Sequence, residues 1–183
     1  QVCMDGECLD EALLVGLDAR LAALPAERRE RGVVLVLHQM GSHGPAYYRR
    51  SPAAGKRFLP ECETHALQDC DRSALVNAYD NSIVYTDRVL AQAIGWLSRQ
   101  TESFAPLLLY VSDHGESLGE NGLYLHGIPY ALAPHEQIQV PMLLWLSEGL
   151  RERRGIDTNC LEARQHESLS HDQLFHSVLG LSK

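Results

Sequence analysis

Three continuous apolar runs dominate the hydropathy pattern of the chain. They are GVVLVLH at residues 32–38, PLLLYVS at 106–112 and VPMLLWL at 140–146. A strand with one face in water alternates apolar and polar side chains, whereas a continuous run is typical of a strand buried on both faces. The pattern therefore predicts three buried strands in a mainly parallel sheet that is covered by helices on both faces.

Helical periodicity occupies the segments around these runs. Apolar side chains recur at near-helical spacing over residues 73–100, and shorter helices are predicted at 9–24 and 172–179. For the last of these, Ser170 is the expected N-cap and Gly180 the expected stop. Helices that alternate with buried strands predict an α/β layered fold. Residues 45–70 lack sustained periodicity, and so long a connection in a compact domain is usually functional.

Length, composition and charge restrict the class of protein. The 183 residues, 45% of them hydrophobic, suffice for the core of one domain, and no apolar run approaches the roughly 18 residues of a membrane span. The formal net charge of -8 disfavours a surface that follows phosphates, so nucleic acid is not expected as a partner. The chain opens on Gln1 without the features of a signal peptide, as expected of a fragment or a processed product.

The spacing of the five cysteines favours disulfides over metal binding. Cys3 with Cys8 and Cys62 with Cys70 each bracket a short polar segment, and neither pair has the C-x-x-C spacing of a zinc knuckle. We therefore expect both pairs to form disulfides, which implies an oxidising compartment. Cys160 is left over, as a free thiol or with a partner outside this sequence.

Ionisable residues follow two of the predicted strands, where sites form in open α/β sheets. The first run ends at His38, and the second continues into Asp113, His114 and Gly115. Adjacent strand side chains point to opposite faces, so Asp113 and His114 can share an ion only where the chain turns, and Gly115 permits a turn. A carboxylate with an imidazole is half of a tetrahedral zinc shell. The alternative is structural, with Asp113 capping a helix that begins near Glu116 and His114 satisfied in the core.

Three histidines share one local pattern, because each directly precedes a glycine: His43, His114 and His126. A glycine beside an imidazole lets the backbone come close to a ligand or substrate. His43 and His126 are therefore candidate metal ligands or substrate contacts, with an ordinary position near a turn as the alternative. The remaining histidines are interpreted as structural: His38, His65, His135, His166, His171 and His176.

Five segments together resemble the lipid A phosphoethanolamine transferases, which include the mobile colistin-resistance enzymes. The segments are LHQMGSHGPAYYRR (37–50), NAYDNSIVYTD (77–87), VSDHGESLGENGLYLHGIPYALAP (111–134), VPMLLW (140–145) and SHDQLFHSVLGL (170–181). They run in order along nearly the whole chain. The combination of SHGP, DHGESLGE and YLHG at this spacing is far narrower than any single short motif.

The resemblance implies an alkaline-phosphatase-like α/β fold, of which residues 1–183 are the C-terminal portion of a sulfatase-like catalytic domain. It also implies that Asp113 and His114 are two zinc ligands, while His43 and His126 contact the substrate phosphate or an additional zinc. The family's remaining zinc ligand, a glutamate, and its threonine nucleophile match no residue here and are expected upstream of Gln1. This chain alone is therefore expected to be inactive.

The activity implied by the resemblance is transfer of phosphoethanolamine from phosphatidylethanolamine to a phosphate of lipid A, which confers polymyxin resistance. Transmembrane helices upstream would anchor the domain to the periplasmic face of the bacterial inner membrane. Two alternatives remain at this point. One is another enzyme of the alkaline phosphatase superfamily that acts on a different glycan, and the other is a non-catalytic metal-binding domain.

Overall fold

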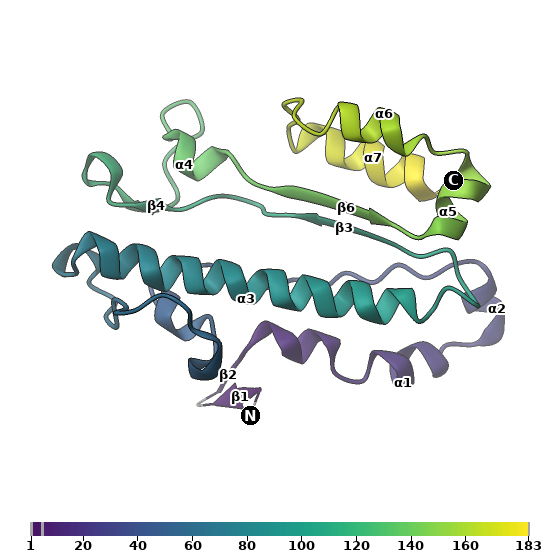
Figure 1. The fold of residues 1–183 in the computed structure, drawn as a ribbon, viewed down its shortest axis with the longest axis horizontal. Helices are drawn as coiled ribbons and strands as arrows, with labels where there is room; N and C mark the ends of the chain where they lie inside the picture. The colour runs from purple at the N-terminus through teal and green to yellow at the C-terminus, as the bar shows by residue number, and fades with distance from the viewer. Residues whose placement is uncertain (1, 5, 183) are drawn as a thin grey trace.

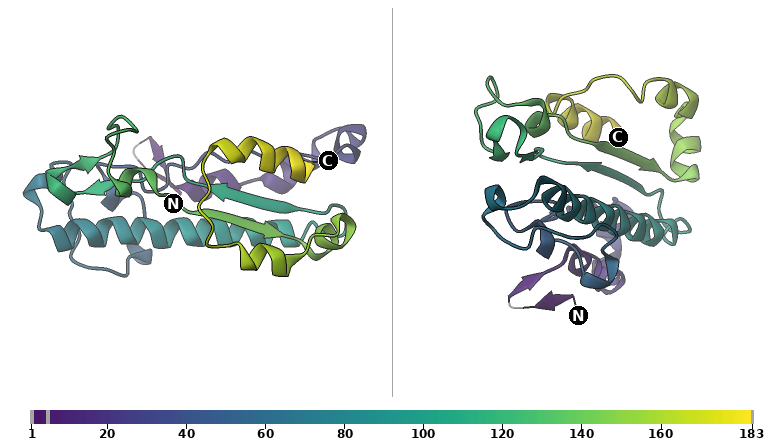
Figure 2. Two further views of the ribbon diagram at one scale, coloured as in Figure 1. Left: turned by 90° about the horizontal axis from the view of Figure 1, so that it is seen from above. Right: turned by 60° about the vertical axis from the view of Figure 1, so that its left-hand side comes forward.

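One long helix organises the structure, a computed structural model that describes residues 2–4 and 6–182. α3 (Arg72–Ser98) runs along the molecule, with the N-terminal segments on one side and the ribbon of β3 (Leu107–Val111) and β6 (Met142–Leu146) on the other (Figure 1). The C-terminal helices lie beyond the ribbon, as the side views in Figure 2 show. Within the described residues, no helix combines the length and the apolar character needed to cross a bilayer.

The prediction of a helix over residues 73–100 is confirmed by α3 to within two residues. Its buried positions recur every three or four residues from Leu75 through Ala78, Tyr85 and Val89 to Trp96, so one face of the helix is in the core. Tyr47, Cys62 and Leu67 pack on this face near its N-terminal end. The long helix thus supplies the surface on which the irregular segment 45–70 is ordered.

The segment 45–70 contains three single turns of 3-10 helix and one disulfide. The turns are η2 (Tyr47–Arg49), η3 (Ala53–Gly55) and η4 (Leu67–Asp69). Both expected disulfides are confirmed: Cys62 with Cys70 beside the core, and Cys3 with Cys8 in the small hairpin of β1 (Cys3–Met4) and β2 (Glu7–Cys8). Among the described residues Cys160 is the free cysteine, and it is exposed.

The single helix predicted for residues 9–24 is wrong. The structure has a 3-10 turn, η1 (Asp10–Leu14), then α1 (Leu17–Ala22) and α2 (Ala26–Glu30). Gly16 separates the first two with φ of 73°, a left-handed conformation that ends helical hydrogen bonding and that glycine adopts at little cost. Asp18 of α1 accepts hydrogen bonds from Trp96 and Gln100, which ties this segment to α3.

The mainly parallel sheet is also a wrong prediction for the described residues. β3 and β6 pair antiparallel, with Leu109 opposite Leu144, and the segment 32–38 forms no strand. Val34 and Val36 in this segment are 81% and 85% exposed. An apolar run shows that a segment can be buried, but a strand exists only where another strand satisfies its backbone, and the run does not encode the direction of that partner.

Short elements follow each strand of the ribbon. After β3 come β4 (Ser117–Leu118), η5 (Glu120–Gly122), β5 (Tyr124–Leu125) and α4 (His135–Ile138). After β6 come α5 (Glu148–Arg154), α6 (Thr158–Ala163) and α7 (Asp172–Ser182). The helix predicted at 172–179 is confirmed, and the Ser170 hydroxyl accepts from the Asp172 amide as expected near its start. Gly180 does not end it, because α7 continues to Ser182.

Candidate metal centre

Three imidazoles from separate loops meet at one end of α3. His43 follows the segment 32–38, His114 follows β3 and His126 follows β5, and one ring nitrogen of each lies within 4.8 Å of the others. The rings of His114 and His126 stack with 3.8 Å between centroids, and the His43 ring stands edge-on to His126 at 4.9 Å. We call this group the histidine triad.

The β4–β5 hairpin is what brings His126 to the other two. Its antiparallel register places Ser117 opposite Leu125, so the next residues outward, Glu116 and His126, also face one another. Nδ1 of His126 lies 3.1 Å from Oε1 of Glu116. A sequence separation of ten residues thereby becomes direct contact between two ionisable side chains.

Each ring of the triad has an oxygen next to its Nδ1. The partners are the carbonyl of Gly44 at 2.6 Å from His43, the carbonyl of Gly115 at 3.0 Å from His114, and Glu116 for His126. An acceptor in that position favours the tautomer with the proton on Nδ1, which leaves the Nε2 lone pair free for a metal. All three rings therefore have the oxygen partner at Nδ1 that metal-ligating histidines usually have.

Glu116 is a candidate site residue that sequence reasoning missed. Its carboxylate is buried, and besides His126 it accepts the amide of Gly44 at 3.1 Å and the hydroxyl of Tyr47 at 3.2 Å. Burial and the Glu116 charge both raise the pKa of Tyr47, so this phenol stays protonated and donates. The position of Glu116 in the DHGE run was a signal, but only the fold shows that it joins the loops that carry His43 and His126.

Asp113 lies at the exposed edge of the triad. Its Oδ1 is 3.9 Å from Nε2 of His114, so the two side chains are on the same side of the turn, and 82% of the Asp113 side chain is exposed. The alternative of a helix cap is wrong, because β4 rather than a helix begins at Ser117. The structure therefore brings all four candidates together, with three imidazoles in the tight group and the carboxylate beside one of them.

Two of the three glycines that follow these histidines are required by close packing. A Cβ on Gly115 would lie 2.1 Å from the carbonyl oxygen of Glu136, and one on Gly44 would lie 2.4 Å from Leu125. Gly115 is thus needed for the approach of the α4 backbone rather than for an unusual turn, which corrects the expected reason. Gly127 has φ of 102°, a conformation that favours glycine.

The donor set of the triad fits a zinc ion. Zinc binds imidazole nitrogen at about 2.0–2.1 Å in tetrahedral sites, which places ligand nitrogens roughly 3.4 Å apart. The nitrogens here lie within 4.8 Å of one another, so small side-chain rotations would bring them to that spacing. Glu116 behind His126 forms the carboxylate–histidine pair that commonly orients a metal ligand.

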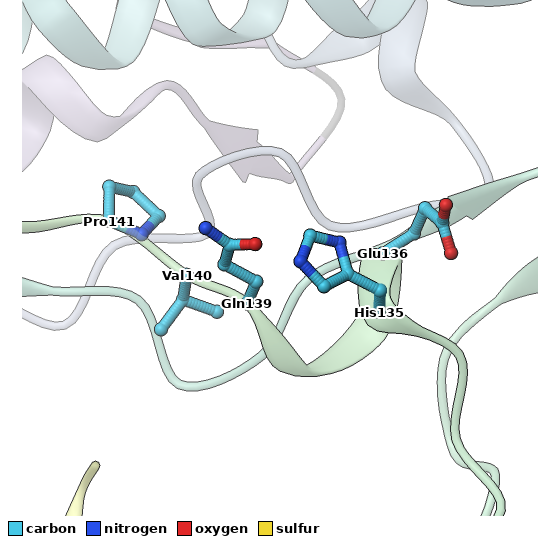
Figure 3. Close-up of a pocket in the computed structure, with 5 residues that line it drawn as sticks. All are labelled: His135, Glu136, Gln139, Val140 and Pro141. Carbon is cyan, nitrogen blue, oxygen red and sulfur yellow. The ribbon is translucent and has the colours of Figure 1, made fainter. Parts of the chain in front are cut away.

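The other histidines lie outside this group. Nε2 of His171 donates to the carbonyl oxygen of Ser112, 2.8 Å away, and so connects the segment before α7 to the end of β3. His135 lines a surface hollow of about 380 Å³ with Glu136, Gln139, Val140 and Pro141 (Figure 3). Figure 3 shows the Glu136 carboxylate pointing away from the His135 ring, and none of the triad lines the hollow. The hollow therefore lacks the convergent groups that the triad has.

Comparison with known protein families agrees with this fold and with the candidate metal centre. A sulfatase family model matches residues 2–183, and the chain belongs to the sulfatase family. Within it, the chain is 49% identical over 181 residues to phosphoethanolamine transferase EptA of Escherichia coli K12 and 48% identical over 175 residues to phosphatidylethanolamine transferase Mcr-1 of E. coli. These matches confirm the resemblance that the motifs indicated.

The matches cover 98% and 96% of the chain but 32% and 30% of these relatives, so the chain spans about a third of their length. A solved structure, the soluble domain of lipooligosaccharide phosphoethanolamine transferase A from Neisseria meningitidis, aligns with a TM-score of 0.90 at 44% identity over 99% of the chain and 53% of that domain. The periplasmic domain of EptC from Campylobacter jejuni aligns with a TM-score of 0.83 at 42% identity, over 97% of the chain and 53% of that domain. The sulfatase-like fold is thereby established.

Proposed function

We propose that this chain is the zinc-binding part of the catalytic domain of a phosphoethanolamine transferase. The observation that carries the proposal is the histidine triad, whose nitrogens lie within 4.8 Å of one another and whose Nδ1 atoms all face oxygens. The similarity to EptA and Mcr-1 extends over nearly all of the chain, which supports the reaction class.

Asp113 and His114 are the proposed ligands of the catalytic zinc, and His43 and His126 the proposed contacts to the substrate phosphate or to an additional zinc. When bound, zinc would offset charge on phosphoryl oxygens and lower the pKa of a nucleophilic hydroxyl. His43 and His126 can donate from Nε2 to a phosphoryl oxygen when protonated, or give that proton to a leaving alkoxide. Glu116 holds His126 in the orientation that this requires.

The family resemblance assigns the nucleophile to a threonine and the remaining zinc ligand to a glutamate, both outside this sequence. That threonine oxygen would attack the phosphorus of phosphatidylethanolamine and release diacylglycerol, and a lipid A phosphate would then take the phosphoethanolamine group from the threonine. The threonines of this chain lie on other segments than the triad: Thr64, Thr86, Thr101 and Thr158. The 183-residue chain by itself is therefore expected to bind metal without catalysing transfer.

The donor and acceptor are lipids, so the active protein must work at a membrane. One relative of known structure is an integral membrane protein, and the chain covers 33% of it with a TM-score of 0.90. We propose that the parent protein acts at the periplasmic face of the inner membrane through an anchor outside this chain, and that its product confers polymyxin resistance. The two disulfides are consistent with that oxidising compartment.

A head-group transfer assay tests this function. A fluorescent phosphatidylethanolamine donor is incubated with lipid A, using this chain and a form extended upstream to include the expected threonine. We expect turnover only from the extended form, with loss on His114→Ala and no change on Thr86→Ala. Turnover by the short chain would refute the placement of the nucleophile, and an extended form that hydrolyses sulfate esters without head-group transfer would favour another superfamily activity.

A further inference from the structure

A buried carboxylate that belongs to none of the family motifs binds the turn just before His43. Asp10, in η1, is 8% exposed. Its Oδ1 accepts the backbone amide of Met40 at 2.9 Å, and its Oδ2 accepts the amide of Gly41 at 2.8 Å. Hydrogen bonds from amides to an ionised carboxylate are roughly twice as strong as neutral ones. Both oxygens of Asp10 are therefore committed to two consecutive amides of one turn.

That turn sets the backbone position from which the His43 side chain projects. The amide of His43 donates to the carbonyl of Met40 at 3.2 Å, and Gly41 between them has φ of 56°. Without Asp10, the amides of Met40 and Gly41 would lose their acceptors, and the turn would lose the two charge-assisted hydrogen bonds that fix it. The segment 32–38 just before the turn forms no strand, so a sheet ladder does not fix it.

Asp10 can act as a fixed point because its own segment is attached to α3. The amide of Glu11 donates to the hydroxyl of Tyr85, a buried residue of α3, at 3.3 Å. The Glu11 carboxylate also pairs with Arg88 at 3.3 Å. A chain of contacts therefore runs from the rigid helix through η1 to the turn before His43.

The other two members of the triad are held differently. His114 directly follows β3, and His126 is held by the β4–β5 hairpin and by Glu116. On the far side of His43, Arg50 donates to its carbonyl and Glu116 accepts from Gly44. We propose that Asp10 is a positioning residue that fixes the near side, so that the nitrogen of His43 meets those of His114 and His126. This inference rests on the proposed function in one respect, namely that the triad binds metal.

The first test measures zinc affinity of the 183-residue chain by competition titration with a chromophoric chelator. In Asp10→Asn the side-chain NH₂ group takes the place of one carboxylate oxygen. This donor then faces a backbone N–H, which is also a donor, so one of the two hydrogen bonds is lost. We expect affinity to fall about tenfold, the lower end of the range for residues that orient metal ligands. Asp18→Asn is the matched control, because Asp18 also ties the N-terminal segment to α3, through Trp96, without contacting the turn. Its affinity should be unchanged, and an equal loss in both variants would overturn the proposal.

A second test separates positioning from general destabilisation. In a His43→Ala background, Asp10→Asn should have no further effect on zinc affinity, because the residue that it positions is gone. A tenfold loss that persists in that background would show that Asp10 acts on the fold as a whole. In the wild-type chain, amide exchange at Met40 and Gly41 should be at least tenfold slower than for an unprotected amide, and unprotected rates would also overturn the proposal.

The failure of the proposed function would look different. If the wild-type chain does not bind zinc, the metal assignment fails, and the role of Asp10 is then decided by histidine ring NMR shifts without metal. Asp10→Asn should move the His43 ring signals and leave those of His126 in place. Unchanged His43 signals would refute positioning whatever the outcome with zinc.

Discussion

The two sides of the molecule differ in which side chains they bury and which they expose. On the side of α3 that carries the segment 45–70, a buried amide orders the backbone: Asn81 is fully buried and bonds the backbone of Arg57 and Phe58. In the region from β6 to α7, large apolar side chains are exposed, with Phe175 at 69% and Leu169 at 56%. Buried polar contacts therefore specify the irregular backbone of the segment 45–70, whereas the C-terminal region depends on helices and a two-stranded ladder.

The largest contrast is expected in the free energy of unfolding. Leu75→Ala removes a side chain that is 1% exposed on α3 and should cost about 2–5 kcal/mol. Phe175→Ala on α7 should change stability by less than about 0.5 kcal/mol, because the ring is largely in solvent already. Urea denaturation followed by circular dichroism measures both. Similar losses for the two variants would contradict the division into a packed side and an exposed side.

A comparison of the two disulfides sharpens this division. Cys62 and Cys70 close a span of eight residues beside the core, so replacing both by alanine should cost about 2.5 kcal/mol through the greater entropy of the unfolded chain. Cys3 and Cys8 are exposed in an outer hairpin that can open locally. Their double alanine variant should therefore lower the urea midpoint less, and an equal or larger shift would show that the hairpin unfolds together with the core.

Glu116 tests whether the buried polar side serves the metal as well as the fold. Glu116→Ala removes the partner of His126 Nδ1 and should weaken zinc binding by about 10–100-fold. Glu116→Gln retains an acceptor oxygen and should recover part of the affinity. The control is Glu136→Ala, because the Glu136 carboxylate points away from the His135 ring in Figure 3. Unaltered zinc affinity in Glu116→Ala would mean that the carboxylate only supports the loops.

The smallest effect concerns acid stability of the β4–β5 hairpin. Burial acts to raise the pKa of Glu120, but hydrogen bonds from the amides of Glu120 and Leu118 and the charge of Arg72 outweigh it, and the pKa is lowered. A lowered folded-state pKa contributes stability that is present above the unfolded value of 4.5 and is lost as pH falls through the folded value. Since its partner Arg72 is 60% exposed and the pair is screened by solvent, Glu120→Gln should cost under about 1 kcal/mol at neutral pH and nothing at the acid end.

Thermal melts between pH 7 and pH 3 check this sign. The difference between wild type and Glu120→Gln should shrink as pH falls, and a difference that grows toward acid would contradict it. The matched control is Glu167→Gln, which removes the exposed pair of Glu167 with Arg164 in the C-terminal region. Its difference in melting temperature from wild type should be smaller still.

Local patterns predicted the elements that depend on local physics. The spacing of apolar residues from Leu75 to Leu97 was sufficient for α3, and short cysteine spacings were sufficient for both disulfides. The strand predicted at 32–38 was wrong because a strand needs a partner strand. The continuous helix predicted across Gly16 was wrong because the sequence does not distinguish a glycine that a helix tolerates from a glycine that ends it.

The site was predictable as a set of residues but not as a network. The repeated His-Gly pattern and the family motifs pointed to His43, His114 and His126, together with Asp113. Their mutual geometry depends on the β4–β5 register and on two buried carboxylates. Asp10 lies in none of the motifs, and the DHGE run marks Glu116 without showing its contacts, because each carboxylate makes hydrogen bonds to a segment that only folding brings near.

Anomalous diffraction at the zinc edge from crystals of this chain soaked in zinc tests the central claim most directly. The account predicts a peak at roughly 2.0–2.3 Å from Nε2 of His114, with Asp113, His43 or His126 as a further ligand. His114→Ala crystals treated in the same way should lose that peak. A peak at His135 or His171 with none at the triad, or no peak at saturating zinc, would contradict the assignment of this centre.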